Sequence, residues 1–167
     1  MSLAQNIEKQ IERQGHVDFF SYTSVENIEA NNNQALSFFE PNTGEVAVTI
    51  LMNAFQFRKS LMYTHFNQSY IESDLYPNAT FEGTVENFDR ASVNQIKIIK
   101  GLIELRGIKK TISIKAKIEK RDGNYTISGS FDLNINDFKI KVPVLLSPNI
   151  AKTINVTFDF KYLPYEN

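Results

Sequence analysis

From about residue 44 to the end of the chain, apolar and polar residues alternate, and no other feature of the sequence constrains the fold as strongly. Val46, Val48 and Ile50, for example, alternate with Ala47 and Thr49. Because successive side chains of an extended strand point to opposite faces, a period of two collects the apolar residues on one face. The pattern predicts antiparallel strands that bury one face and expose the other to solvent.

Turn sequences separate the alternating segments, which return at 80–88, 112–119, 125–133 and 154–160. Pro41-Asn42-Thr43-Gly44 and Arg121-Asp122-Gly123-Asn124 supply residues that favour tight turns, and the second predicts the clearest hairpin of the chain. Residues 95–107 are apolar on both faces, which predicts a strand that is covered on its outer side or that lies in a dimer contact.

The first 43 residues carry a weaker pattern. Residues 17–22 and 35–40 are predicted as strands, and residues 25–32 as a short helical turn capped by Ser24. The spacing of Ile7 and Ile11 suits a helix face better than a strand, and the type of this segment stays undecided. We therefore expect an N-terminal extension over residues 1–16, of which residues 1–3 are a vector remnant, and a β-barrel domain over residues 17–167.

One helix is predicted in the middle of the chain, between two strands. From Lys59 onward Met62, Phe66 and Tyr70 follow a four-residue spacing, and the run ends before Pro77. A barrel can use such an inserted helix as a lid or plug over one opening. The alternative is that these side chains simply pack on the sheet as part of the core.

Seven or eight strands with one inserted helix describe a mostly β protein, either an antiparallel barrel or a sandwich. Neither the first nor the last strand carries the Pro or inward charge that protects a free sheet edge. We therefore expect the two ends of the sheet to pair and close a lipocalin-like barrel of about eight strands. At 167 residues the chain has the length of one domain that needs neither metal nor disulfides to fold.

Charge and residue content argue against several function classes. Eighteen Lys and Arg oppose nineteen Asp and Glu without a basic run, so nucleic acid is not an expected partner. No stretch of about 18 apolar residues predicts a transmembrane segment. The chain has no Cys, and neither His16 nor His65 lies near a glycine-flanked serine, although Glu72 and Asp74 could in principle join His65 at a metal. We expect a non-enzymatic protein with no catalytic residues, no metal site and no cofactor.

Two motifs carry a resemblance to a known family. The first is Tyr76-Pro77-Asn78-Ala79-Thr80-Phe81, and the second is the glycine-bounded segment Gly101-Leu102-Ile103-Glu104-Leu105-Arg106-Gly107 that follows it. The order and spacing of these two motifs resemble those of the YceI-like family of lipocalin-like, polyisoprenoid-binding proteins. The terminal strand, rich in Val and Phe, is also similar to that family. The resemblance covers about residues 17–163, and the chain departs from the family in having no Trp near the first strand. It implies a periplasmic or secreted protein whose export signal has been removed.

Binding of one long apolar molecule, such as a polyisoprenoid or a fatty acid or amide, is therefore the predicted function. Gly83, Gly101 and Gly129 fall at inward positions, where a missing side chain bends the sheet or leaves room for a ligand. The residues predicted to line the tunnel are Val48, Ile50, Met52, Met62, Phe66, Phe81, Val85, Ile99, Ile103, Ile114, Ile127, Phe131 and Phe158. Those predicted at its mouth, for selection of a head group, are Arg58, His65, Tyr70 and Tyr76. The alternative is a barrel filled by its own side chains, which would act through its surface or as a homodimer.

Overall fold

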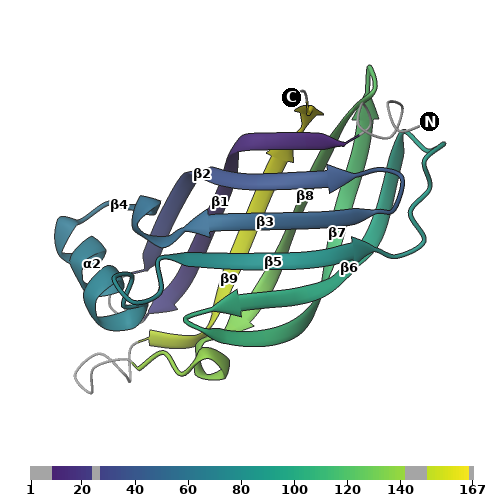
Figure 1. Cartoon of the computed structure of the whole chain (residues 1–167). Helices are drawn as coiled ribbons and strands as arrows, with labels where there is room; N and C mark the ends of the chain where they lie inside the picture. The colour runs from purple at the N-terminus through teal and green to yellow at the C-terminus, as the bar shows by residue number, and fades with distance from the viewer. Residues whose placement is uncertain (1–8, 24–26, 142–149, 166–167) are drawn as a thin grey trace.

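The structure, a computed structural model, describes residues 9–23, 27–141 and 150–165, and it is a closed antiparallel β-barrel (Figure 1). Each long strand pairs with its neighbours in the order β1-β2-β3-β5-β6-β7-β8-β9, and β1 also pairs with β9, which closes the sheet. The predicted eight-stranded barrel is thus confirmed. Its strands are β1 (Gln10–Thr23), β2 (Ile28–Glu40), β3 (Glu45–Leu51), β5 (Asn78–Val85), β6 (Asn94–Leu105), β7 (Ile108–Arg121), β8 (Asn124–Asn134) and β9 (Ile150–Lys161).

Short elements complete the described chain. Between β3 and β5 lie the 3-10 turn η1 (Met52–Ala54), the two-residue strand β4 (Gln56–Phe57), the helix α2 (Ser60–His65) and the π-helical turn η2 (Phe66–Tyr70). The 3-10 turn η3 (Ile135–Phe138) follows β8, and the strand β10 (Leu163–Pro164) ends the described part. In Figure 1, α2 stands at one end of the barrel, away from both termini.

The period of two determines which side chains face the interior. On β7 the buried residues Ile114, Ala116 and Ile118 alternate with the exposed Lys115 and Lys117. Removing one large aliphatic side chain from water contributes about 1.5–3 kcal/mol, so a shift by one residue would expose a whole row of them and bury charges instead. This cost in free energy prevents such a shift in the pairing of neighbouring strands.

The N-terminal strands differ from the sequence prediction. β1 begins at Gln10, before the predicted start at Val17, and Ile11 is buried in this strand rather than on a helix. The predicted helical turn over 25–32 is wrong for residues 28–32, which form the start of β2, while residues 24–26 lie outside the described residues. Asn32 explains the difference, because it is fully buried and donates a hydrogen bond to the carbonyl of Leu51 at 3.0 Å. A polar residue at an inward position interrupts the alternation of apolar and polar residues by which a strand is recognised in a sequence.

Two-residue turns of the same kind connect β6 to β7 and β7 to β8. Arg106 and Gly107 both have positive φ, as do Asp122 and Gly123. This is the type I′ geometry whose twist matches that of the flanking strands, and it requires a residue such as glycine that tolerates positive φ. The hairpin predicted around residues 121–124 is confirmed.

The inward glycines make room for phenylalanine rings rather than for an empty space. Gly83 and Gly101 lie opposite each other on β5 and β6, and a Cβ on either would come within 2.7 Å of the Phe81 ring. At Gly129 a Cβ would come within 2.9 Å of the Phe158 ring and 2.8 Å of the Lys115 carbonyl. The tip of each ring thus occupies the space that a glycine leaves beside the sheet.

Packed aromatic side chains seal the end of the barrel opposite α2. Phe39 contacts Phe88 and Tyr125 edge to face, with ring centroids 5.3 and 5.1 Å apart, and Tyr162 lies 5.9 Å from Phe39. The buried Ser37 Oγ lies 2.6 Å from the Tyr162 hydroxyl and donates to the carbonyl of Ala47 at 3.0 Å. Burial raises the pKa of the Tyr162 hydroxyl far above its ordinary value. We call Phe39, Phe88, Tyr125 and Tyr162 the aromatic plug.

Candidate ligand-binding site

Two adjoining cavities occupy the barrel between the aromatic plug and α2. The inner chamber has about 590 Å³ of unfilled space, measured out to its opening. It is lined by Val17, Val46, Val48, Ile50, Ala79, Thr80, Phe81, Ile99, Ile103, Ile114, Ile127, Phe131, Val156, Phe158 and Phe160, in which Thr80 is the single polar residue. The interior is therefore not completely filled by its own side chains.

The outer chamber lies beneath α2 and η2 and has about 960 Å³ of unfilled space, measured in the same way. Six residues line both chambers: Val17, Ile50, Ala79, Ile103, Phe131 and Val156. Those that line the outer chamber alone are Phe19, Ser21, Ile28, Met52, Phe55, Phe57, Met62, Phe66, Tyr70, Ile71, Leu105, Leu133, Ile135, Ile140 and Ile154.

Most residues predicted for the tunnel lie on these walls. Of the thirteen, Val85 is the exception: it is buried but lines neither chamber. Met52, Met62 and Phe66 line the outer chamber, and the remaining nine line the inner chamber or both. The geometry therefore places twelve of the thirteen predicted residues on the walls of two adjoining apolar chambers.

The residues predicted at the mouth are dispersed. Tyr70 is buried and lines the outer chamber, whereas Arg58 is exposed and His65 half-buried, and neither lines a chamber. Tyr76 packs against the β6–β7 turn: its ring lies 2.9 Å from the position of a Cβ on Gly107 and 5.7 Å from the Arg106 guanidinium. Contact of Tyr76 with Gly107 and of Phe81 with Gly101 gives a physical reason for the two motifs noted in the sequence.

Sequence reasoning missed much of the outer chamber. Phe55 and Phe57 come from short elements with no period to recognise, and Ile135 and Ile140 come from the turn after β8. Phe19, by contrast, lies between the buried Val17 and Ser21 on β1, and alternation within the predicted strand over residues 17–22 was a usable signal.

An aromatic cluster fastens α2 and η2 to the barrel wall. Phe66 stacks on Phe19 of β1 with ring centroids 5.4 Å apart, and it also contacts Phe55 at 5.8 Å and Phe57 at 5.0 Å. Phe57 in turn contacts Tyr63 on α2 at 6.2 Å. We call residues 60–70 the lid, because Met62, Phe66 and Tyr70 line the chamber beneath it.

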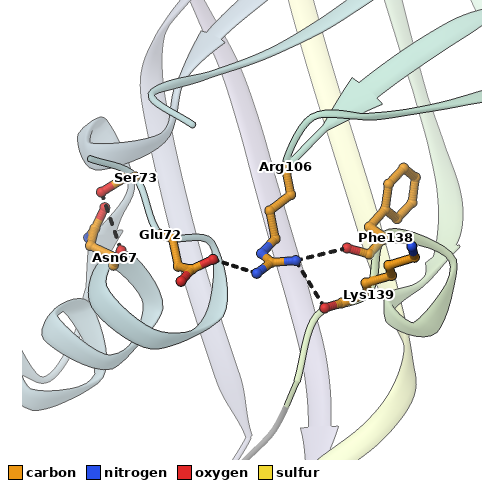
Figure 2. Close-up of polar contacts among 6 residues, drawn as sticks. All are labelled: Asn67, Glu72, Ser73, Arg106, Phe138 and Lys139. Carbon is orange, nitrogen blue, oxygen red and sulfur yellow. Dashed lines mark hydrogen bonds and ion pairs between the residues drawn. The ribbon is translucent and has the colours of Figure 1, made fainter. Parts of the chain in front are cut away.

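Arg106, in the β6–β7 turn, connects the segment that follows the lid to the segment around η3 at the same end, as Figure 2 shows. Its guanidinium donates to a carboxylate oxygen of Glu72, just after η2, at 2.5 Å, and to the carbonyls of Phe138 and Lys139, at 3.4 and 3.0 Å. Glu72, Arg106 and Lys139 all have positive φ, a conformation that disfavours side chains other than glycine. The hydrogen bonds to one guanidinium stabilise three unfavourable turns at once.

Charge is absent from the chamber walls in the part of the chain that the structure describes. Ser21, Tyr70 and Thr80 are the polar lining residues, and none of them is ionised at neutral pH. Burial raises the pKa of the Tyr70 hydroxyl above its ordinary value of 10. Such walls suit methyl and methylene groups and disfavour an ionic group.

The chain belongs to the YceI-like family. The family model of the YceI-like domain matches residues 9–162, nearly the whole barrel. No curated protein sequence matches the chain at a significant level. The solved structures that are similar to this chain have the same fold as the family model implies.

Three of these structures are similar over most of their length. A polyisoprenoid-binding domain from Saccharophagus degradans, implicated in plant cell wall breakdown, has a TM-score of 0.79 at 13% identity and covers 95% of this chain and 99% of its own. BcnA of Burkholderia cenocepacia has a TM-score of 0.74 at 15% identity, with 89% and 96% covered. A YceI protein of Campylobacter jejuni, in a mutant form with a monobromobimane guest, has a TM-score of 0.66 at 19% identity, with 86% and 88% covered. At these identities the likeness establishes the shared barrel.

None of the helices in the described ranges combines the length and the apolar character that a membrane span needs.

Proposed function

We propose that this protein binds one long apolar molecule inside the barrel, as a non-catalytic carrier or store. The observation that supports this most is the pair of adjoining apolar chambers, which run from the aromatic plug to the lid. The chain belongs to the YceI-like family, and a solved structure with a similar barrel is described as a polyisoprenoid-binding domain. The proposed ligand is a linear isoprenoid, a fatty acid or a fatty amide, whose methyl and methylene groups suit these apolar walls.

Burial of the chain drives binding in this proposal. About 15 buried carbons contribute on the order of 10 kcal/mol before the costs of association and of ordering the chain, which leaves micromolar or tighter affinity. The chain tip would lie among the inner residues near Phe160, whose ring is 6.3 Å from the plug residue Tyr162. Because the plug seals that end, the ligand would enter past the lid.

Organic extraction of the folded protein, followed by mass spectrometry, tests the proposal directly. One apolar molecule per chain is expected in the extract, or else saturable uptake of a polyprenyl or fatty-acyl probe by extracted protein. An empty extract combined with no saturable binding of either probe would refute the carrier function.

The family resemblance also supports a periplasmic or secreted location for the natural protein. Fractionation of the source cells with an antibody against the barrel measures this, and recovery in the cytosolic fraction alone would contradict it.

A second candidate function is self-association through the outer face of β6, and a row of exposed apolar side chains favours it. Ile96, Ile98 and Leu102 are 61%, 38% and 40% exposed on that face, where the exposed Lys100 lies between Ile98 and Leu102. The row lies between the exposed Glu82 and Glu86 on the β5 side and the exposed Lys115 and Lys117 on the β7 side. A two-fold axis along β6 would place the acidic side of one copy over the basic side of the other.

Sedimentation equilibrium distinguishes this candidate from a monomeric carrier. Ile98→Lys should convert a dimer to a monomer, whereas Leu163→Lys, at a residue that is 62% exposed on β10, should not. A wild-type protein that stays monomeric at a concentration of hundreds of micromolar would rule out the dimer.

A further inference from the structure

Exposed apolar side chains concentrate at the end of the barrel where the lid lies. We call the described residues 19–23, 27–30, 51–77, 104–110, 134–141 and 150–153 the lid end (Figure 1). Ten large apolar residues in the described ranges are exposed, and five of them belong to the lid end: Tyr22, Leu51, Leu61, Tyr63 and Leu75. The opposite end has two, Val93 and Leu163. Half of these side chains thus lie at the end where the proposed ligand would enter.

The lid itself carries apolar side chains toward the chamber and toward solvent. Met62 and Phe66 line the outer chamber, whereas Leu61 and Tyr63 on the same helix are 65% and 40% exposed. A lid that only covered the chamber would present polar side chains to water, because a surface helix normally has one apolar and one polar face. The outer side of the lid therefore suits contact with a second apolar medium.

Basic residues accompany the exposed apolar side chains. The lid end has eight Lys and Arg against five Asp and Glu, whereas the whole chain has eighteen against nineteen. Arg58, Lys109 and Lys139 are exposed and form no ion pair with any other described residue. The lid end is thus the positively charged part of a chain whose net charge is slightly negative, and it attracts anionic surfaces.

Exposed Leu and Tyr beside Lys and Arg suit the surface of an anionic bilayer. Leucine inserts at the boundary between head groups and acyl chains, tyrosine lies at the head-group level, and the basic side chains contact lipid phosphates. A long apolar molecule resides in bilayers rather than in water. Because the aromatic plug seals the other end of the barrel, such a molecule would enter and leave past the lid.

We propose that the lid end docks on the surface of an anionic lipid bilayer, with Leu61, Tyr63 and Leu75 at the interface and Arg58 and Lys109 against the head groups. An apolar molecule then passes between the bilayer and the chambers without crossing water. The transfer step rests on the proposed carrier function, whereas docking itself does not require a bound ligand.

Cosedimentation of the full-length protein with lipid vesicles tests the docking. Phosphatidylcholine vesicles with about 30% phosphatidylglycerol should bind the protein at least about tenfold more tightly than pure phosphatidylcholine vesicles. Sodium chloride at about 0.5 M should weaken this binding, because salt screens charges at an exposed surface. Absence of binding to the anionic vesicles would overturn the inference and leave the carrier function intact.

Substitution of two exposed leucines tests the apolar part of the surface. Leu61→Gln combined with Leu75→Gln should weaken binding to the anionic vesicles at least about tenfold. The matched control is Val93→Gln combined with Leu163→Gln, at residues that are 66% and 62% exposed at the opposite end, and it should leave binding unchanged. All four side chains are exposed, so both variants should melt close to the wild type.

Substitution of two cations tests the charged part. Arg58→Gln combined with Lys109→Gln should weaken binding to the anionic vesicles about fivefold for each charge removed. Arg121→Gln combined with Lys161→Gln removes the same charge from exposed residues at the opposite end and should have a much smaller effect. Equal losses in the lid-end variants and in their controls would show that vesicle binding does not use the lid end and would overturn the inference.

Transfer of a fluorescent fatty chain from the protein to anionic vesicles tests the second step. If transfer occurs during contact, its rate should rise in proportion to vesicle concentration, and the Leu61→Gln, Leu75→Gln variant should lose most of this dependence. A rate that is independent of vesicle concentration would mean that the chain first dissociates into water, and would overturn direct transfer. Binding to vesicles by a protein that takes up no fatty or polyprenyl chain would refute the carrier function and leave the docking standing.

Discussion

At the scale of single residues, the inward position of Phe131 and the outward position of Lys117 can be compared directly. Phe131 lines both chambers, whereas Lys117 is exposed and lies 3.5 Å from Glu119. Phe131→Asp places a carboxylate without a partner in an apolar interior, at a cost of several kcal/mol out of a total stability of about 5–15 kcal/mol. Lys117→Asp should cost less than about 1 kcal/mol.

Thermal unfolding followed by circular dichroism should therefore show a large loss of stability for Phe131→Asp and a near-wild-type midpoint for Lys117→Asp. Equal midpoints for the two variants would mean that the faces of β7 and β8 are assigned incorrectly.

His16, on the outer face of β1, makes stability depend on pH. A hydrogen bond to Asn33, at 2.5 Å from Nδ1, raises the pKa of His16 above 6.5 against the opposing effect of burial, and the carboxylates of Asp18, 2.7 Å from Nε2, and Asp159 raise it further. Both ring nitrogens donate at once only in the protonated form, so protonation stabilises the folded state.

This stabilisation is complete below pH 6.5 and is lost as the pH rises through the higher pKa of the folded state. Urea unfolding should therefore show a small decrease in stability between about pH 6 and pH 8, below about 1 kcal/mol because His16 is 42% exposed. His16→Gln should remove most of this slope. A slope that persists in the variant would assign it to other groups.

At the scale of elements, an aromatic cluster holds the lid directly, and one guanidinium holds the segment that follows it through Glu72. Arg106→Met keeps the aliphatic stem but removes the hydrogen bonds to Glu72, Phe138 and Lys139. A loss of about 1.4 kcal/mol in lid contacts makes the open lid about tenfold more populated. Stopped-flow exchange of a fluorescent fatty chain should therefore become about tenfold faster, with affinity nearly unchanged because binding and release both accelerate.

Lys110→Met is the matched control for the lid. Lys110 forms an ion pair with Asp137 of η3, at the same end of the barrel, but makes no described contact with the lid or with Glu72. It should leave exchange rates unchanged. A large decrease in melting temperature for Arg106→Met without faster exchange would show that the helix is ordinary core and that it does not gate the chamber.

Which elements could be predicted from the sequence depended on whether their contacts leave a local pattern. Alternation over β3, β5, β7, β8 and β9 predicted the inward faces, because burial on one side of a strand repeats every two residues. On β1 the register shifts around Gly15 interrupt that repeat. The hydrogen bond from Arg106 to Glu72 joins residues 34 positions apart and leaves no local pattern by which it could be predicted.

At the scale of the whole molecule, binding and stability are linked, because the ligand occupies chambers that exist only in the closed barrel. A ligand that binds only the folded state adds about 2.7 kcal/mol of stability at one hundred times its dissociation constant. For a chain of this length that corresponds to a rise of about 5–10 °C in the melting midpoint. Extraction of the ligand should lower the midpoint by this amount.

Re-addition of a polyprenol should restore the midpoint, and a variant with obstructed chambers supplies the control. Ala79 lines both chambers, and in Ala79→Met the flexible side chain would extend into the space where they meet. This variant should unfold near the midpoint of the extracted wild type and respond little to the polyprenol, because its own side chain occupies the ligand's position. A wild type with the same midpoint before extraction, after extraction and after re-addition would show that the chambers contribute nothing to stability through a bound chain.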